Sequence, residues 1–453
     1  MKKALYSALA INLLFISLCM SSCQSPINAN DDRNENVLRI ASWDEYIDEG
    51  GEDSYAEGSR PLYEEFEDWY FKQTGKEIKV EYIALQDNET MYNKIKMGDH
   101  YDILCPSEYM IMKLAAENML QKLPSTFFDT NTETNYYAKY LSPYIKEVFD
   151  TGKLNDGSSW SEYAAGYMWG STGFVFNPAK IPSDAMKSWN ALADKHCERK
   201  ITAKDNVRDS YFMGLGMYYE QDLLNLKAQY ERGEVSREAY KQELSNKMND
   251  TSVETMNGVK KKLENMRGNL YGLETDEGKL DVIMGRLDAS FQWSGDAVYI
   301  IDEAESNSEE KENPLLLEYS IPESASNLWF DGWVLMKDAN VDAATAFINF
   351  LSMPENVIRN MYYIGYTSCI GGDEVFDYVV ETYGAEEGAP NCVDYDLSYF
   401  FGNGYTLKTT EDQTRRQLFA QYPDNNTIDR LVVMKYFDKE TNERANRMWN
   451  NIK

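Results

Sequence analysis

Short runs of β-forming residues alternate along this chain with segments of helical periodicity, and this alternation limits the possible folds most strongly. The runs Val37–Ser42, Ile78–Leu85 and Asp102–Pro106 are typical of strands. Helical spacing of apolar residues follows at Pro61–Thr74 and Glu108–Leu123. Strands that alternate with helices predict α/β units built on largely parallel sheets.

A second set of strands is predicted further along the chain, at Gly173–Asn177, Lys200–Ala203 and Ala289–Ser294. Gly332–Met336 then resumes the strand character of the first set, and Ala343–Leu351 is predicted to be helical. Because 453 residues exceed what one hydrophobic core usually holds, we expect two α/β lobes.

Three segments interrupt the alternating pattern. Met217–Arg267 is long, charged and helical in period, and we interpret it as an added helical pair. Ile370–Tyr422 is rich in glycine and acidic residues and is interpreted as a second addition. The acidic run Asp302–Asn313 predicts a solvated loop.

The first 36 residues predict export of the chain. Lysines at positions 2 and 3 precede the apolar segment Ala4–Met20 and then Ser21-Ser22-Cys23, which is typical of a signal peptide over residues 1–22. A cysteine directly after small residues is similar to a bacterial lipobox, so Cys23 is predicted to carry a lipid. Residues 23–36 would then be a flexible tether. The alternative is an ordinary cleaved signal with an incidental cysteine.

The charge balance argues against one class of partner and fits another. The formal net charge is -30, which argues against nucleic acid, whose binding needs basic patches. An acidic chain attracts and steers cations, although much of the charge serves solubility. No metal or cofactor is expected, and the presence of only two histidines, His100 and His196, argues against a His-rich metal site or a Ser-His-Asp triad. Disulfide pairing stays open among Cys105, Cys197, Cys369 and Cys392.

Acidic side chains stand among aromatic ones at several strand ends. The stretch Trp329-Phe330-Asp331-Gly332-Trp333 places one carboxylate among three rings, immediately before the predicted strand Gly332–Met336. Rings attract organic cations and pack against methylenes, and the carboxylate partners an ammonium that leaves water. Similar clusters are Ser42–Tyr46, Pro106–Tyr109, Trp293 and Tyr366. Each cluster alone is typical of core packing, but ligands in open α/β sheets bind beyond the carboxyl ends of strands.

The order and spacing of these blocks resemble the extracytoplasmic spermidine/putrescine-binding proteins of ATP-driven polyamine importers. The resemblance runs through nearly the whole chain after the tether, outside the two additions. The matching blocks are Ser42–Tyr46, Asn88–Tyr92, Tyr101–Ile103, Pro106–Tyr109, Trp169–Gly173, Asp205–Phe212, Trp293–Gly295, Trp329–Asp331, Ile364–Tyr366 and Tyr422–Asp424.

The resemblance implies a two-lobed periplasmic-binding-protein fold, type II-like, in which two crossover connections form a hinge. Lobe 1 would comprise residues 37–170 and 330–374, and lobe 2 residues 171–329 and 375–453. It also implies a monomeric, lipid-anchored binding protein, outside the cytoplasm, that hands polyamine to a membrane permease and catalyses no reaction.

The resemblance further implies which residues contact the ligand. Aligned motif by motif, they are Trp43, Asp44, Tyr46, Ser107, Tyr109, Asn206, Asp209, Trp293, Trp329, Asp331 and Tyr366. The methylene chain would be enclosed by Trp43, Tyr109, Trp293, Trp329 and Tyr366. Asp331 would pair with the most deeply held ammonium, and Asp209 would receive another amine. Asp44 stands where the best-known member of the family has a hydroxyl residue, and Asn206 where that member has an aspartate. The choice between putrescine and spermidine therefore stays open, with a slight lean toward spermidine that rests on the resemblance alone.

Two other classes compete with this interpretation. A glycan-binding surface lipoprotein would also be acidic and rich in aromatic residues, but such proteins favour helical repeats or sandwiches. A glycoside hydrolase needs two carboxylates, and candidate pairs are inevitable among 75 acidic side chains. Within the transport class, another small organic cation is an alternative ligand.

Overall fold

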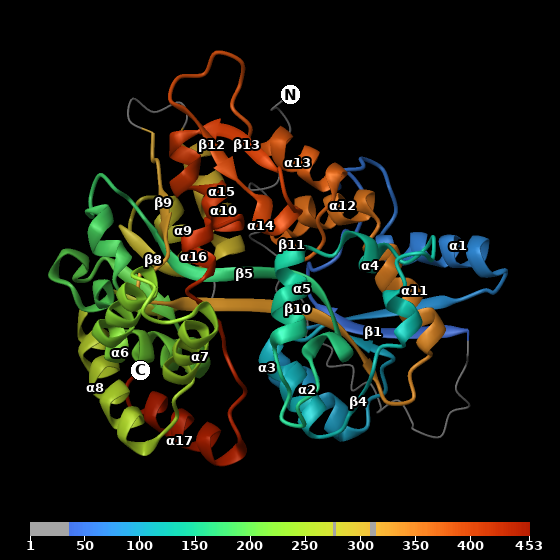
Figure 1. Ribbon diagram of the computed structural model, residues 1–453, viewed down its shortest axis with the longest axis horizontal. Coiled ribbons are helices and arrows are strands. Elements are labelled where there is room, and N and C mark those ends of the chain that lie inside the picture. Colours follow the sequence, from blue (N-terminus) through green and yellow to red (C-terminus); the bar gives the residue numbers. More distant parts are fainter. Residues whose placement is uncertain (1–35, 275–277, 309–313) are drawn as a thin grey trace, which may run out of the picture.

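Two α/β halves are joined by a pair of long strands that run between them (Figure 1). The computed structural model describes residues 36–274, 278–308 and 314–453. The predicted signal peptide, Cys23 and nearly all of the tether therefore lie outside the described residues. The joining strands are β5 (Ala164–Phe176) and β10 (Ser326–Met336), which pair antiparallel. This confirms the predicted two-lobed fold with crossover strands.

We call the half that contains β1, β2 and β3 lobe 1. β1 (Val37–Trp43) pairs in parallel with β2 (Lys79–Leu85) and β3 (Ile103–Leu104), as the alternation predicted. α1 (Leu62–Thr74) ends at Gly75, whose positive φ of 71° lets the chain turn sharply back toward the sheet. The other helices of this half are α2 (Asn88–Met97), α3 (Glu108–Ala116), α4 (Tyr136–Tyr140), α5 (Pro143–Thr151), α11 (Val341–Leu351) and α12 (Pro354–Ile364).

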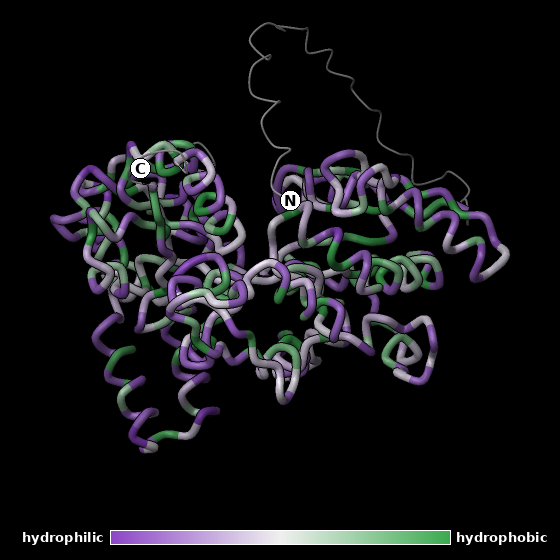
Figure 2. Tube along the Cα trace, turned by 90° about the horizontal axis from the view of Figure 1, so that it is seen from above, coloured by the Kyte–Doolittle hydropathy of each residue, from purple (hydrophilic) through white to green (hydrophobic). Residues whose placement is uncertain are grey.

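The half that contains β6, β7 and β8 is lobe 2. β6 (Ile201–Lys204) pairs in parallel with β7 (Gly272–Glu274) and β8 (Ala289–Trp293). Its helices are α6 (Val207–Glu231), α7 (Arg237–Met248), α8 (Val253–Asn269), α9 (Gly278–Ile283), α10 (Ser294–Ser306) and α17 (Lys439–Asn450). The tube in Figure 2 shows the two halves side by side, joined through the middle of the molecule.

The crossover strands form the centre of the sheet. The strand order is β2-β1-β3-β10-β5-β8-β6-β7, and every residue of β5 and β10 is buried. A strand covered on both faces shows no alternation of polar and apolar residues. The prediction that this strand begins at Gly332 was wrong, since β10 begins at Ser326. The missing alternation explains why its start could not be located from the sequence. Trp329 and Asp331 lie inside the strand, and the register shifts between Asp331 and Gly332.

The segment after α13 (Asp373–Tyr383) contacts both halves. β12 (Cys392–Asp396) and β13 (Thr406–Thr410) form a separate antiparallel pair, seen above β5 in Figure 1. α14 (Ser398–Phe401) packs on α5, and α15 (Gln417–Gln421) packs on α10. The second predicted addition, residues 370–422, thus covers the junction of the halves. The division of the chain into lobes at 374/375 stays a prediction.

Two predictions about the other irregular segments need correction. Met217–Arg267 contains parts of three helices instead of a pair, because α6 begins at Val207 and α7 and α8 follow it. Within the acidic run Asp302–Asn313, α10 continues to Ser306, and residues 309–313 lie outside the described residues. The helix extends because its buried face, which includes Ile301 and Ala304, still packs on the core.

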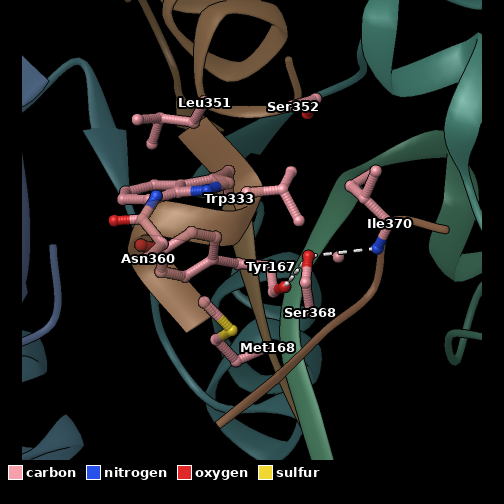
Figure 3. A pocket seen from close by; sticks show the side chains of 10 residues that line it. Tyr167, Met168, Trp333, Leu351, Ser352, Asn360, Ser368 and Ile370 are labelled. Carbon is pink, nitrogen blue, oxygen red and sulfur yellow. Dashed lines mark hydrogen bonds between the residues drawn. The ribbon is translucent and has the colours of Figure 1, made fainter. Parts of the chain in front are cut away.

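A cavity of about 10 Å³ lies behind the crossover strands, between Tyr167, Trp333 and Asn360 (Figure 3). Trp333 Nε1 and Asn360 Nδ2 are buried there, and neither donates a hydrogen bond within the described part of the protein. A space of this size holds about one water molecule, whose oxygen can accept hydrogen bonds from both nitrogens. The cavity is too small for a solute, so it belongs to the hinge packing.

Other features of the fold concern cysteines and the membrane. Cys105, Cys197, Cys369 and Cys392 are free thiols, three of them buried. Among the helices of the described residues, none is long and apolar enough to cross a membrane.

Candidate functional site

Asp331 is a buried carboxylate at the junction of the lobes. Its side chain accepts a hydrogen bond of 2.6 Å from the Tyr46 hydroxyl. Burial raises the pKa of this carboxyl above its usual value, while hydrogen bonds from Tyr46, Ser107 and Trp43 counteract part of the rise. No basic side chain within the described ranges forms an ion pair with Asp331, so its hydrogen-bond partners are all uncharged donors.

The ends of two parallel strands place these donors. Trp43 is the last residue of β1, and Tyr46 follows it on the same turn. Ser107 follows β3 as the N-cap of α3 and forms an isolated β-bridge with Asp331. The Asn88 amide fixes Ser107 through two hydrogen bonds of 3.0 Å. The predicted convergence of Trp43, Tyr46, Ser107 and Asp331 is therefore present, although their contact with a ligand stays a prediction.

A row of aromatic rings extends from Asp331 toward lobe 2. The Tyr366 ring lies 6.1 Å from that of Tyr46 and 5.3 Å from that of Trp329, centroid to centroid. Tyr366 can lie this close only because position 295 is glycine, where an added Cβ would lie 1.7 Å from the Tyr366 ring. The Trp329 indole likewise packs on Gly170 and donates to the Ser171 carbonyl at 3.1 Å.

The lobe 2 end of this row carries lysines as well as acids. The Tyr366 hydroxyl donates to Asp296 Oδ1 at 3.2 Å. The Lys279 ammonium lies 2.9 Å from the same oxygen, and the Lys204 ammonium lies 3.5 Å from Oδ2. Lys204 Nζ also lies 4.3 Å from the centroid of the Trp293 ring. Trp293 thus stands where it was predicted, but one of its faces contacts a lysine of the same chain.

Asn206 and Asp209 lie together at the start of α6. Asn206 is the N-cap and accepts the Asp209 backbone N–H at 2.8 Å, while its amide nitrogen donates to the Asp209 carboxylate at 2.6 Å. This reciprocal cap explains the pair structurally. The neighbouring Asp205 is exposed and accepts the Trp449 indole N–H at 3.1 Å. Burial raises the pKa of the Asp209 carboxyl.

Tyr109 and Arg208 form a contact that crosses between the lobes. The Arg208 guanidinium, on α6, lies 3.9 Å from the centroid of the Tyr109 ring, on α3. The Tyr109 hydroxyl donates to Glu89 at 3.1 Å. Cation–π contacts of this kind are worth about 0.5–2 kcal/mol, so this pair favours contact between the lobes.

Glu108 is a buried acid that the sequence-based set omitted. It lies between Ser107 and Tyr109, is only 3% exposed, and its Oε2 accepts no hydrogen bond from the described residues. Burial raises the pKa of its carboxyl to about 8, and the negative charge of Asp331 adds to the rise while Arg208 opposes it. The sequence pointed to Glu108 only through its position between Ser107 and Tyr109, which were both predicted site residues.

Asp44 differs from the other predicted residues. It is exposed on the turn after β1, next to Glu45, whose positive φ of 51° bends the chain there. No hydrogen bond or ion pair of Asp44 is seen among the described residues.

The predicted set omitted four further charged residues at the junction, which are Lys204, Lys279, Arg208 and Asp296. Lysine inside a strand gives no sequence signal for a site, whereas Asp296 follows Trp293 by three residues in the first turn of α10.

The site combines a desolvated carboxylate with a row of rings, which suits an organic cation. A buried carboxylate without a cationic partner stabilises an incoming ammonium strongly, because both charges have left water. The rings supply apolar walls and negative π-faces.

Comparison with solved structures supports the same architecture. The substrate-binding protein of a spermidine/putrescine ABC transporter from Streptococcus pneumoniae superposes with a TM-score of 0.59 at 24% identity, covering 92% of this chain and 98% of that chain. A lipoprotein of Treponema pallidum gives a TM-score of 0.57 at 17% identity, with coverage of 92% and 99%. At these identities the likeness shows the fold alone.

Curated relatives extend the comparison to sequence. A spermidine/putrescine-binding periplasmic protein of Escherichia coli K12 is 24% identical over 337 residues, which cover 74% of this chain and 77% of that protein. A putrescine-binding periplasmic protein of Pseudomonas aeruginosa is 26% identical over 321 residues, covering 70% and 74%. The family model for bacterial extracellular solute-binding proteins matches residues 62–371, more than half of the chain, and the protein belongs to this family.

Proposed function

We propose that the protein captures a polyamine between its lobes outside the cytoplasm and delivers it to the permease of an ATP-driven importer. The observation that carries the proposal is Asp331, a buried carboxylate with only uncharged hydrogen-bond donors, next to the Tyr46, Tyr366 and Trp329 rings. The names of the curated relatives support the same ligand class. The protein acts by binding and release, without bond chemistry.

In this proposal the ammonium of the ligand pairs with Asp331, and the methylenes pack on the aromatic row. Trp43, Tyr46 and Ser107 hold the carboxylate, while Trp293 and Asp209 stand on the opposite lobe. A ligand that touches both lobes stabilises their closed arrangement, and the permease recognises that arrangement. The Arg208–Tyr109 contact adds to the closed form.

A thermal-shift screen tests the ligand class. Putrescine, cadaverine, spermidine and spermine are compared with choline and with neutral oligosaccharides on the purified protein. A ligand that binds only the folded state raises the melting temperature according to its concentration relative to Kd. We expect stabilisation by at least one polyamine. Stabilisation by oligosaccharides alone would support a glycan-binding protein, and stabilisation by choline alone another organic cation.

We further propose that the protein is a monomer anchored through a lipid on Cys23. The support is the sequence Ser21-Ser22-Cys23 after an apolar segment. Metabolic labelling with radioactive palmitate is expected to label the wild-type protein and not Cys23→Ser. Wild-type protein that takes up no lipid would contradict the anchor.

A further inference from the structure

Lys204 is a buried lysine at the end of a central strand of lobe 2. It is the last residue of β6, pairs in register with Glu274 of β7, and its side chain is only 1% exposed. Lysine is almost never fully buried unless an anion compensates its charge. Its surroundings must therefore supply the same features that any bound ammonium requires.

These features are present around the Lys204 ammonium. Asp296 Oδ2 lies 3.5 Å away, and the Trp293 ring centroid lies 4.3 Å away. The positive charge of Lys204 also opposes the burial-driven rise in the pKa values of the Glu274 and Asp209 carboxyls, so both acids lie within its field. An indole face with surrounding carboxylates is what a polyamine amine needs.

The surroundings of Lys204 are continuous with the Asp331 site. Asp296 accepts from the Tyr366 hydroxyl at 3.2 Å, and the Tyr366 ring neighbours that of Tyr46, which donates to Asp331. One aromatic row thus joins Asp331, which lacks a cationic partner among the described residues, to Asp296, which already has two lysines.

We propose that Lys204 is a specificity-determining residue whose ammonium occupies the far amine position, so that the protein selects a short diamine over a triamine. The inference rests on the proposed function. A tethered ammonium competes with a free amine at an effective concentration on the order of millimolar or above. Two ammoniums at one point also repel each other, which adds a cost to the longer ligand. Putrescine, bound at Asp331, would be too short to need the position that the Lys204 ammonium fills.

Titration calorimetry with putrescine and spermidine tests this inference. The wild-type protein is expected to bind putrescine about tenfold or more tightly than spermidine. Lys204→Met keeps an unbranched side chain, one heavy atom shorter, and removes the charge. It is expected to lower that preference by about tenfold, through a gain in spermidine affinity. Lys204→Arg keeps the cation and is expected to keep the preference.

Lys200→Met is the matched control, because Lys200 immediately precedes β6 but is half exposed and pairs with Asp288 at the surface. An unchanged preference in a folded Lys204→Met protein would overturn the inference. Wild-type protein that binds spermidine as tightly as putrescine would overturn it without any variant. Wild-type protein that binds neither, with a melting temperature showing it is folded, would overturn the proposed polyamine function itself.

Discussion

The two lobes present buried acids at their junction in opposite ways. In lobe 1, Asp331 is held by the hydroxyl of Tyr46 and other uncharged donors. In lobe 2, Asp296 contacts the ammoniums of Lys279 and Lys204. A carboxylate that is already paired gains little from a second cation, whereas one held only by neutral donors gains much. Under the proposed function, ligand charge would therefore be recognised mainly by lobe 1, and the number of acids at the junction exceeds the number of amine positions.

Removal of the Asp331 carboxylate should weaken polyamine binding more than any other change considered for the two lobes. We expect Asp331→Ala to weaken polyamine binding about 100-fold, or ~3 kcal/mol, because the ammonium would then be buried without a partner. Titration calorimetry measures the loss. Asp331→Asn preserves the shape of the side chain and should lose a similar amount.

Asp296→Asn is the counterpart in lobe 2 and should change putrescine affinity far less. If both Asp331 variants bound polyamine with near-wild-type affinity, Asp331 in lobe 1 would not be the main partner of the ligand's ammonium. Because the raised pKa of Asp331 reports a costly buried charge, the melting temperature of ligand-free Asp331→Asn should not fall.

The second prediction concerns the hydrogen bond that orients Asp331. Tyr46→Phe should lower the free energy of unfolding by about 2 kcal/mol, the usual worth of a hydrogen bond to a charged group. The same bond lowers the pKa of Asp331, so its loss raises that pKa further. Amine binding needs the ionised carboxyl and is lost as pH falls through its pKa. The loss should therefore begin at a higher pH in the variant.

Urea unfolding and calorimetry across pH 4–8 measure both effects. Tyr144→Phe serves as a control, because the buried Tyr144 hydroxyl makes no hydrogen bond within the described residues. If Tyr144→Phe destabilised the protein as much as Tyr46→Phe, the loss would reflect packing and not the Asp331 bond.

The third prediction uses Glu108 as a titratable reporter of lobe 1. With its pKa at about 8, Glu108 holds a proton at neutral pH. An ammonium at Asp331 favours the ionised form, so affinity should rise about fivefold, or ~1 kcal/mol, between pH 7 and pH 9. Glu108→Gln should remove this rise. Glu89→Gln, which alters an exposed neighbour, should retain it.

The pH dependence of the stability of Glu108→Gln tests the raised pKa of Glu108 independently of ligand binding. The folded protein keeps the Glu108 proton between pH 4.5, the ordinary pKa of a glutamate, and about pH 8, whereas the unfolded chain releases it. Folded protein then binds more protons, so the contribution of this group to stability falls as pH rises through that window. Glu108→Gln should therefore gain in melting temperature relative to wild type at pH 8 but not at pH 4. An equal difference at both pH values would contradict a buried, protonated Glu108.

Much of the lobe 1 site could be predicted from the sequence because it depends on strand ends. Trp43 ends β1 and Ser107 comes three residues after the end of β3, and parallel strands bring their carboxyl ends to one edge. The start of β10 could not be predicted, since a strand buried on both faces has no period of two. The contact of Lys204 with Asp296 could not be predicted either, because these residues come together only through the pairing of β6 with β8. The cap formed by Asn206 and Asp209 depends on residues three apart in the sequence, whereas ligand contact by these two residues stays a prediction.

The smallest predicted effect is that of Asp44, the one predicted acid that is exposed. Its carboxylate lies in high dielectric, where interactions between charges are weak and screened beyond about 8 Å at physiological salt. Asp44→Asn should change affinity less than about twofold at physiological salt and somewhat more at low salt, where steering acts over longer distances. Calorimetry at low and physiological NaCl measures this dependence, with Asp331→Asn as the comparison whose effect should vary little with salt. A loss at Asp44 as large as that at Asp331 would mean that Asp44 is drawn into the closed site, and lobe 1 would then hold two strong amine partners.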